Sequence, residues 1–273
     1  ALVYKLSTEE QRARQKLRLQ SSFTSIDIDQ YGYVYLVSRP DVEDVIKKIN
    51  FKGQDVLRKG GYIPPIGDVV YEEIDETVTT GPSSLVDVAV SADGIFYSVL
   101  DENRGRIFTY DSEGNLLYIF GQIGNQSTMF RKPASLTYFN DDIIVTDTSN
   151  NSIIVFEPTE FGQLINEATR LYFSNKYSEA KEYWEKVLKL NSNYFLAYAG
   201  IGKAQLREEN FEEAMENLKL GYDYYNYSRA YEQYRNTQLN KVLPYALVLG
   251  FIGLGYMFVK SMYNSVKRES EEN

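Results

Sequence analysis

Apolar and polar residues alternate in short runs between residues 20 and 157, and turn residues separate the runs. Residues 26–38, 86–101 and 106–121 each alternate around a turn that contains glycine. A period of two residues is typical of strands with one buried face, and such turns are typical of hairpins. The pattern therefore predicts a series of β-hairpins in this part of the chain.

The hairpins repeat along the sequence. Residues 99–111 align with residues 145–157 at a spacing of 46 residues, which places Asp101 on Asp147. Repeats of about 40–50 residues with four short strands each are typical of propeller blades, and a β-sandwich is the alternative fold. The sequence predicts three visible blades, with residues 61–82 inserted between the first and the second.

The second unit, YSVLDENRGRIFTYDSEGNLLYIFG, resembles a blade of the NHL repeat family. The residues that carry this resemblance are Asp101, Asn103, Arg106, Ile107, Asp111 and Gly114. The third unit departs from the family pattern at Ser152, where the family usually has arginine. It also predicts only three strands before the helical part begins. Because closed propellers commonly take such a missing strand from their N-terminal end, we expect further blades upstream.

From Phe161 the apolar period lengthens to that of a helix. Residues 166–193 and 198–223 each predict a helix, a turn and a second helix, and they align at a spacing of 34 residues. Small and aromatic residues recur at this spacing in the pairs Ala168–Gly202, Tyr177–Phe211, Ala180–Ala214 and Trp184–Leu218. Residues 228–242 predict a further helix that caps the array.

This helical part resembles the tetratricopeptide repeat, from which it departs at Leu164, Tyr198 and Ser192. The resemblance implies a small concave surface that binds a partner protein. The groove-lining positions that it implies are Tyr172, Phe173, Lys203 and Arg207. Packing of the two aromatic residues against a neighbouring helix is the alternative.

Residues 242–259 are uncharged and lie between Lys241 and Lys260. At about 1.5 Å per residue this segment approaches the thickness of the hydrocarbon core, so it predicts a transmembrane helix. Glycines within spans let another helix approach closely, and here they are Gly250, Gly253 and Gly255. The capping helix runs into this segment without a linker, and Pro244 is its one interruption.

Charges near the span do not decide its orientation, because three basic residues lie on either side. We expect the body outside the cell and the C-terminus inside, because the acidic body without cysteine or histidine suits an extracytoplasmic domain. A cytoplasmic protein with a tail anchor is the alternative. No signal peptide is visible in residues 1–20.

Composition narrows the chemistry further. The net charge of −9 argues against a nucleic-acid-binding surface. The chain has no cysteine and no histidine, which excludes thiolate nucleophiles, His-ligated metal and a Ser-His-Asp triad. The sequence therefore assigns no catalytic residue, no metal ligand and no cofactor.

The sequence predicts a multidomain chain. Its expected parts are all-β propeller blades in residues 1–158, an α-helical tetratricopeptide-like array in residues 161–240, a transmembrane helix in residues 242–259 and a charged tail in residues 260–273.

Two functions from different classes fit this organisation. The first is a membrane-anchored scaffold that binds the bilayer and other subunits of a membrane complex. Resemblance to propeller-plus-repeat proteins of Gram-positive bacteria implies a carbohydrate ABC importer as that complex. The second is a calcium-dependent lactonase-like propeller, for which Asp27 and Asp87 take equivalent positions on the innermost strands. The third blade carries Thr137 there, which argues against a ring of ligands.

Overall fold

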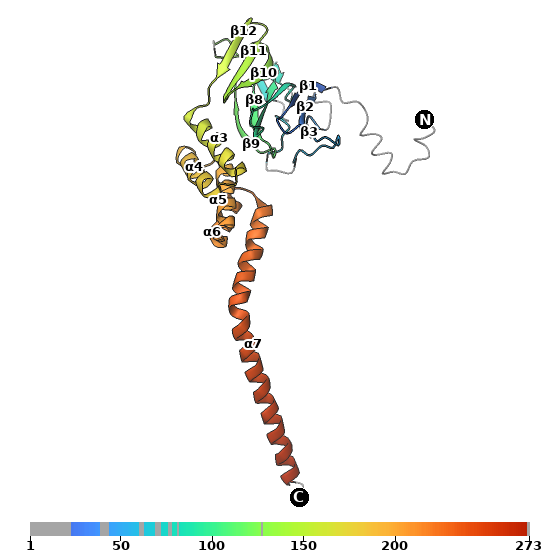
Figure 1. The fold of residues 1–273 in the computed structure, drawn as a ribbon, viewed down its shortest axis with the longest axis vertical. Coiled ribbons are helices and arrows are strands. Elements are labelled where there is room, and N and C mark those ends of the chain that lie inside the picture. Colours follow the sequence, from blue (N-terminus) through green and yellow to red (C-terminus); the bar gives the residue numbers. More distant parts are fainter. Residues whose placement is uncertain are drawn as a thin grey trace, which may run out of the picture. The chain divides into compact units, whose positions relative to one another are not determined.

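The computed structural model describes residues 23–38, 44–59, 63–68, 72–75, 78–80, 82–126 and 128–271. By its contacts the chain divides into two compact units, Ala1–Lys176 and Tyr177–Asn273. The described strands and one helix, α3, belong to the first unit, and helices α4 to α7 belong to the second (Figure 1). The fourfold domain division predicted from the sequence stays a prediction.

The first unit is built from antiparallel sheets of consecutive strands. The first sheet contains β1 (Phe23–Ile28), β2 (Val34–Ser38) and β3 (Ile46–Ile49). The second contains β6 (Leu85–Val90), β7 (Phe96–Asp101), β8 (Ile107–Asp111) and β9 (Leu116–Phe120). The third contains β10 (Pro133–Phe139), β11 (Asp142–Asp147) and β12 (Ser152–Phe156). A hairpin of β4 (Glu72–Asp75) and β5 (Val78–Thr80) lies within the predicted insertion.

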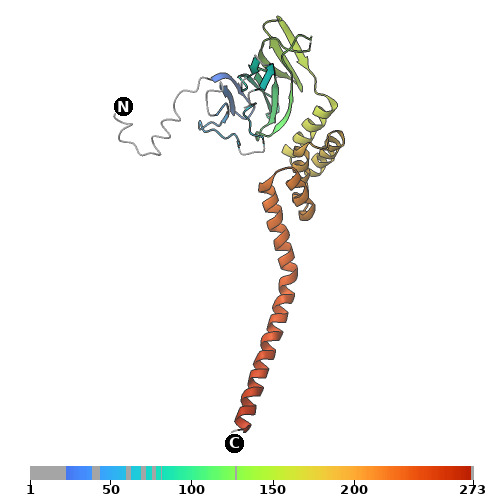
Figure 2. The same ribbon diagram turned by 180° about the vertical axis from the view of Figure 1, so that it is seen from behind.

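The sheets lie side by side as consecutive propeller blades (Figures 1 and 2). Strand β6 lies next to both β1 and β10, so the first strand of each sheet is the innermost one. One apolar cluster fills the space between the first two blades, and Tyr35, Tyr97 and Phe108 are fully buried in it. A second cluster, around Phe130 and Val145, fills the space between the last two. The prediction of a partial propeller is confirmed at this level.

The predicted turn residues have visible roles. Asp111 accepts hydrogen bonds from the backbone N–H groups of Glu113 and Asn115, at 3.0 and 2.9 Å. Gly114 follows with a φ of +90°, and a Cβ atom there would lie 2.7 Å from the carbonyl oxygen of Arg58. The turn between β8 and β9 therefore requires glycine both for its backbone conformation and for space.

The helices repeat as the sequence predicts. Helix α3 (Glu160–Phe173) begins at Thr159, whose hydroxyl accepts a hydrogen bond from the Gly162 N–H. The helices that follow are α4 (Tyr177–Leu190), α5 (Phe195–Arg207), α6 (Phe211–Leu220) and α7 (Tyr224–Glu271). Asn175 and Glu209, which are 34 residues apart in the sequence, both have a φ of +62° in the turns before α4 and α6. The two helix–turn–helix segments therefore share one local geometry.

Small residues allow close helix packing in the second unit. A Cβ atom on Gly202 of α5 would lie 2.6 Å from Cγ of Leu218 in α6. A Cβ atom on Gly221, after α6, would lie 2.7 Å from Cα of Ala199. The expectation that paired helices touch at these small positions is confirmed for α5 and α6.

Helix α7 runs without interruption from Tyr224 to Glu271, with Pro244 inside it. This confirms the prediction that the capping helix continues into the apolar segment without a linker. Large apolar side chains along this segment are exposed, including Leu249, Phe251 and Phe258.

Candidate functional site

The innermost strands carry carboxylates that join neighbouring blades. Asp27 of β1 accepts a 2.7 Å hydrogen bond from the Val90 N–H of β6. Asp87 of β6 accepts a hydrogen bond of the same length from the Leu136 N–H of β10. An innermost strand has no further strand beside its inner edge, so its N–H groups need other acceptors. These two carboxylates are such acceptors.

The predicted equivalence of Asp27 and Asp87 is wrong. Each innermost strand has an irregularity after its first residue, and the pairing beyond it aligns Ser25 with Asp87 and Ser135. Two residues later the same register aligns Asp27 with Ala89 and Thr137. The two carboxylates therefore lie at different levels of the propeller, although both point to the same side of their strands.

The carboxylates at the strand ends cap backbone groups. Asp147 accepts hydrogen bonds from the N–H groups of Arg131, Lys132 and Ser149, and Asp101 accepts them from Ser84 and Asn103. Burial by itself would raise the pKa of Asp147, but its many backbone donors outweigh burial and lower that pKa. At Asp101 burial prevails and raises the pKa.

These bonds explain why aspartates recur in the blades without invoking a metal. In the part of the chain that the structure describes, no three acidic side chains gather closely enough to hold a metal ion.

Arg170 attaches α3 to two blades. Its Nε donates a 2.8 Å hydrogen bond to Asp93, in the turn between β6 and β7. Its two other nitrogens donate to the two carboxylate oxygens of Asp141, between β10 and β11. The guanidinium also lies 5.0 Å from the ring centroid of Phe96. Burial alone would raise the pKa of Asp93, but hydrogen bonds from Ser91, Arg170 and the Ile95 N–H lower it.

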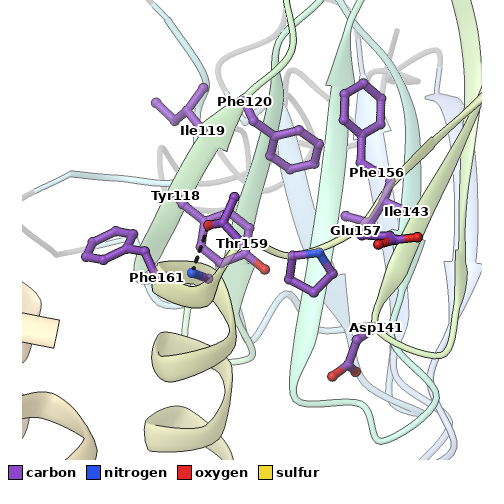
Figure 3. A pocket seen from close by; sticks show the side chains of 11 residues that line it. Tyr118, Ile119, Phe120, Asp141, Ile143, Phe156, Glu157, Thr159 and Phe161 are labelled. Atoms are coloured by element: carbon purple, nitrogen blue, oxygen red, sulfur yellow. Dashed lines mark hydrogen bonds between the residues drawn. The ribbon is translucent and has the colours of Figure 1, made fainter. Parts of the chain in front are cut away.

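A pocket of about 320 Å³ lies beside this attachment, between β9, β11, β12 and the start of α3. Aromatic rings and carboxylates line it together (Figure 3). Its lining residues are Tyr118, Ile119, Phe120, Asp141, Ile143, Phe156, Glu157, Pro158, Thr159, Phe161 and Gly162. The sequence analysis missed this pocket, because its residues come from segments that only the fold brings together.

The polar groups around the pocket differ in how they are used. The Tyr118 hydroxyl donates a 3.0 Å hydrogen bond to Asn166 of α3, and burial raises the pKa of Tyr118. Asp141 pairs with Arg170. Glu157 is exposed and has no hydrogen bond or ion pair with any residue that the structure describes. Glu157 therefore leaves one uncompensated negative charge at the pocket.

The predicted groove residues fall in two units. Tyr172 and Phe173 are half-buried in α3 of the first unit, and their rings contact each other edge to face at 5.5 Å. Lys203 lies in α5 of the second unit, with its Nζ atom 3.7 Å from an Asp223 oxygen. Arg207 lies over the ring of Tyr177 at 5.3 Å. Their role in binding stays a prediction.

The predicted glycines of the apolar segment, Gly250, Gly253 and Gly255, lie on α7. A Cβ atom on any of them would meet no other atom within 4 Å. Among the described residues, one helical segment, Tyr224–Met262, is long and apolar enough to cross a membrane, with a mean hydropathy of 2.0 in its most apolar window.

The sequence profile of the NHL repeat family matches residues 130–156, which form β10 to β12. No curated protein sequence matches the chain. The matched residues are the third blade, and the resemblance noted above for the second blade extends the same pattern.

Solved structures that match half of the chain include large propeller proteins. The Cps50 (Swd1) β-propeller domain from Myceliophteria thermophila is 12% identical, and the match covers 50% of this chain and 40% of that one at a TM-score of 0.35. Hydrazine synthase from Kuenenia stuttgartiensis is 10% identical, with 50% and 36% covered at 0.29. Raptor from Chaetomium thermophilum is 16% identical, with 50% and 16% covered at 0.26. The chain thus spans less than half the length of each, and these scores carry no functional argument.

Proposed function

We propose that the chain is a non-enzymatic scaffold, anchored in a membrane by α7, that binds other subunits of a membrane complex. One observation carries this proposal: the apolar part of α7 is long enough to cross a bilayer, and none of its most apolar window is buried in the protein. A helix that is apolar on all sides needs apolar surroundings.

The exposure of this segment supports a bilayer over a soluble core. Leu249 is 69% exposed and Phe251 is 71% exposed, whereas soluble proteins rarely expose contiguous apolar patches of this extent. Lipid around residues 242–259 would cover these side chains. The unbroken helix would also hold the residues before it close to the bilayer, rather than on a flexible tether.

The blades and the helix pairs supply surfaces for protein partners. Propeller blades and helical repeats both commonly act as binding modules. Both end blades expose apolar side chains, with Ile26 and Ile28 on β1 and Ile153 and Val155 on β12. We assign the helix pairs to the tetratricopeptide class because their turns and small residues repeat at 34 residues. A carbohydrate ABC importer is the complex that we propose.

Membrane insertion and orientation can be tested with single cysteines, because the chain has none of its own. We would place one cysteine in a blade turn, Ser149→Cys, and one after the apolar segment, Asn264→Cys. With the body outside the cell, a membrane-impermeant maleimide labels Ser149→Cys in intact cells and Asn264→Cys only after lysis. The reverse pattern indicates the cytoplasmic tail-anchored adaptor. Release of the protein by alkaline carbonate contradicts membrane insertion altogether.

Partners can be tested by mild extraction of the native protein, followed by mass spectrometry of what co-purifies. Stoichiometric importer subunits are the expected result. A lone protein that binds calcium and hydrolyses a lactone would contradict the scaffold and favour the enzyme.

A further inference from the structure

The pocket beside α3 arises from a mismatch in strand number between two neighbouring blades. The blade of β6 to β9 has four strands, whereas the blade of β10 to β12 has three among the described residues. Tyr118 and Phe120 of β9 therefore face a region with no fourth strand opposite. The first turn of α3, with Phe161 and Gly162, closes only part of that region (Figure 3).

We propose that this pocket binds a large aromatic or aliphatic side chain of a partner protein, with a lysine or arginine next to it in the partner's sequence. This inference rests on the proposed scaffold function and names the chemistry that one of its surfaces recognises.

The walls of the pocket determine the apolar part of the ligand. Phe120 contacts Tyr118 and Phe156 at ring-centroid distances of 6.2 and 5.1 Å, and Phe161 and Ile143 add further apolar surface. Pockets for drug-sized molecules occupy about 300–1,000 Å³, so a volume of about 320 Å³ suits a single large side chain. Buried aromatic anchors of this kind commonly dominate protein–protein binding.

The charge at the margin determines the neighbouring residue. Glu157 has no cationic partner among the described residues, whereas Asp141 is already neutralised by Arg170. A basic residue beside the anchor would pair with Glu157, and an acidic residue there would be repelled. The net charge of −9 favours a basic partner in the same direction.

Short peptides test this chemistry directly on the full chain in lipid nanodiscs. The probe is acetyl-Gly-Trp-Lys-Gly-amide with a fluorinated indole, and its binding is followed by fluorine NMR. The comparison peptides replace lysine by glutamate or tryptophan by alanine. We expect the Trp-Lys peptide to bind at least about threefold more tightly than the Trp-Glu peptide, as a partly exposed ion pair provides, and the Ala-Lys peptide not to bind.

Two variants locate the binding. Glu157→Gln keeps the shape of the pocket and should weaken Trp-Lys binding about two- to fivefold. Glu160→Gln removes an exposed carboxylate one turn-position away that does not line the pocket, and should leave binding unchanged. Gly162→Leu should weaken binding about tenfold or more by filling the pocket. Its Cβ atom would lie 3.4 Å from Pro158 Cβ, an ordinary contact, so α3 should still form.

Three results would overturn the proposal: equal binding of the Trp-Lys and Trp-Glu peptides, undiminished binding to a folded Gly162→Leu variant, or no peptide binding at millimolar concentration. Circular dichroism establishes whether that variant folds, and Glu157→Gln tests the charge independently of it. Failure of the scaffold proposal is distinguishable, because it appears in the maleimide labelling and co-purification. If Gly162→Leu retains all co-purifying partners and the wild type binds no peptide, the pocket proposal fails and the scaffold stands.

Discussion

Replacing Arg170 by alanine should detach α3 from the blades without unfolding them. Arg170 donates three hydrogen bonds to carboxylates in the turns of two different blades and stacks on Phe96. All of these contacts leave with the guanidinium. The blades keep their own apolar clusters, in which Arg170 takes no part.

The size of the effect follows from how exposed these groups are. The Arg170 side chain is 28% exposed, and those of Asp93 and Asp141 are 32% and 44% exposed. The more exposed pair with Asp141 contributes about 0.5–1 kcal/mol. The hydrogen bond to Asp93 and the stacking on Phe96 contribute about 1.5–2 kcal/mol together. A total of about 2–3 kcal/mol raises the detached population about 30- to 150-fold.

Hydrogen exchange of the α3 amides measures this population. Protection of residues 160–173 should fall by that factor in Arg170→Ala, while the strands β6 to β8 keep theirs. Arg207→Ala is the matched control, because Arg207 ends α5 as Arg170 nears the end of α3 but has only an aromatic contact printed by its surroundings, at 5.3 Å from the Tyr177 ring. Unchanged protection of α3 in Arg170→Ala would refute the reasoning.

The same attachment depends on pH. Because the folded protein holds the pKa of Asp93 below its ordinary value, this carboxylate stabilises the fold fully above that ordinary value of 3.8. The stabilisation is lost as the pH falls through the lower, folded pKa. Protection of α3 should therefore decrease below about pH 4 in the wild type, and Arg170→Ala should show a weaker decrease.

Three further predictions concern positions elsewhere in the chain. In a carboxyl-carbon NMR titration, Asp147 should titrate below the ordinary aspartate pKa and Asp101 above it, and the same direction for both would contradict the balance of burial and backbone bonds described here. Gly221→Ala should lower the free energy of unfolding of the second unit by about 1–3 kcal/mol in urea titrations, because its Cβ would lie 2.7 Å from Cα of Ala199, whereas Gly253→Ala has open space and should not. Glu209→Asn should raise that free energy by about 0.5–1 kcal/mol, because asparagine tolerates the φ of +62° better than glutamate, and a loss of stability would contradict this account.

Local patterns in the sequence predicted the elements well because their causes are local. The turn at Asp111–Gly114 depends on a side chain that bonds its own backbone and on a glycine with positive φ. The 34-residue helical repeat shows in the sequence because its small residues face a partner helix at fixed intervals. Each of these signals lies within a few residues of the structure that it specifies.

Features that depend on long-range contacts were not predictable in this way. Arg170 meets Asp93 across 77 residues of sequence, and no local pattern links them. The misalignment of Asp27 with Asp87 has a related cause. Because side chains alternate with a period of two, a shift by two residues keeps the same face and leaves the pattern unchanged. Only the strand pairing reveals which level each carboxylate occupies.

The inner strands also indicate that the two ends of the blade array meet their surroundings differently. Asp27 and Asp87 each accept an N–H group from the next blade along the chain. At the corresponding positions β10 has Thr137 and Ser135, and Ser135 is hydrogen-bonded to Thr146 within its own blade at 2.7 Å. A structure that docks beside β10 therefore meets hydroxyls in place of a carboxylate acceptor. This face consequently offers a weaker acceptor for a further blade than the two internal interfaces, and its exposed Phe139 makes apolar contact the larger part of any docking there.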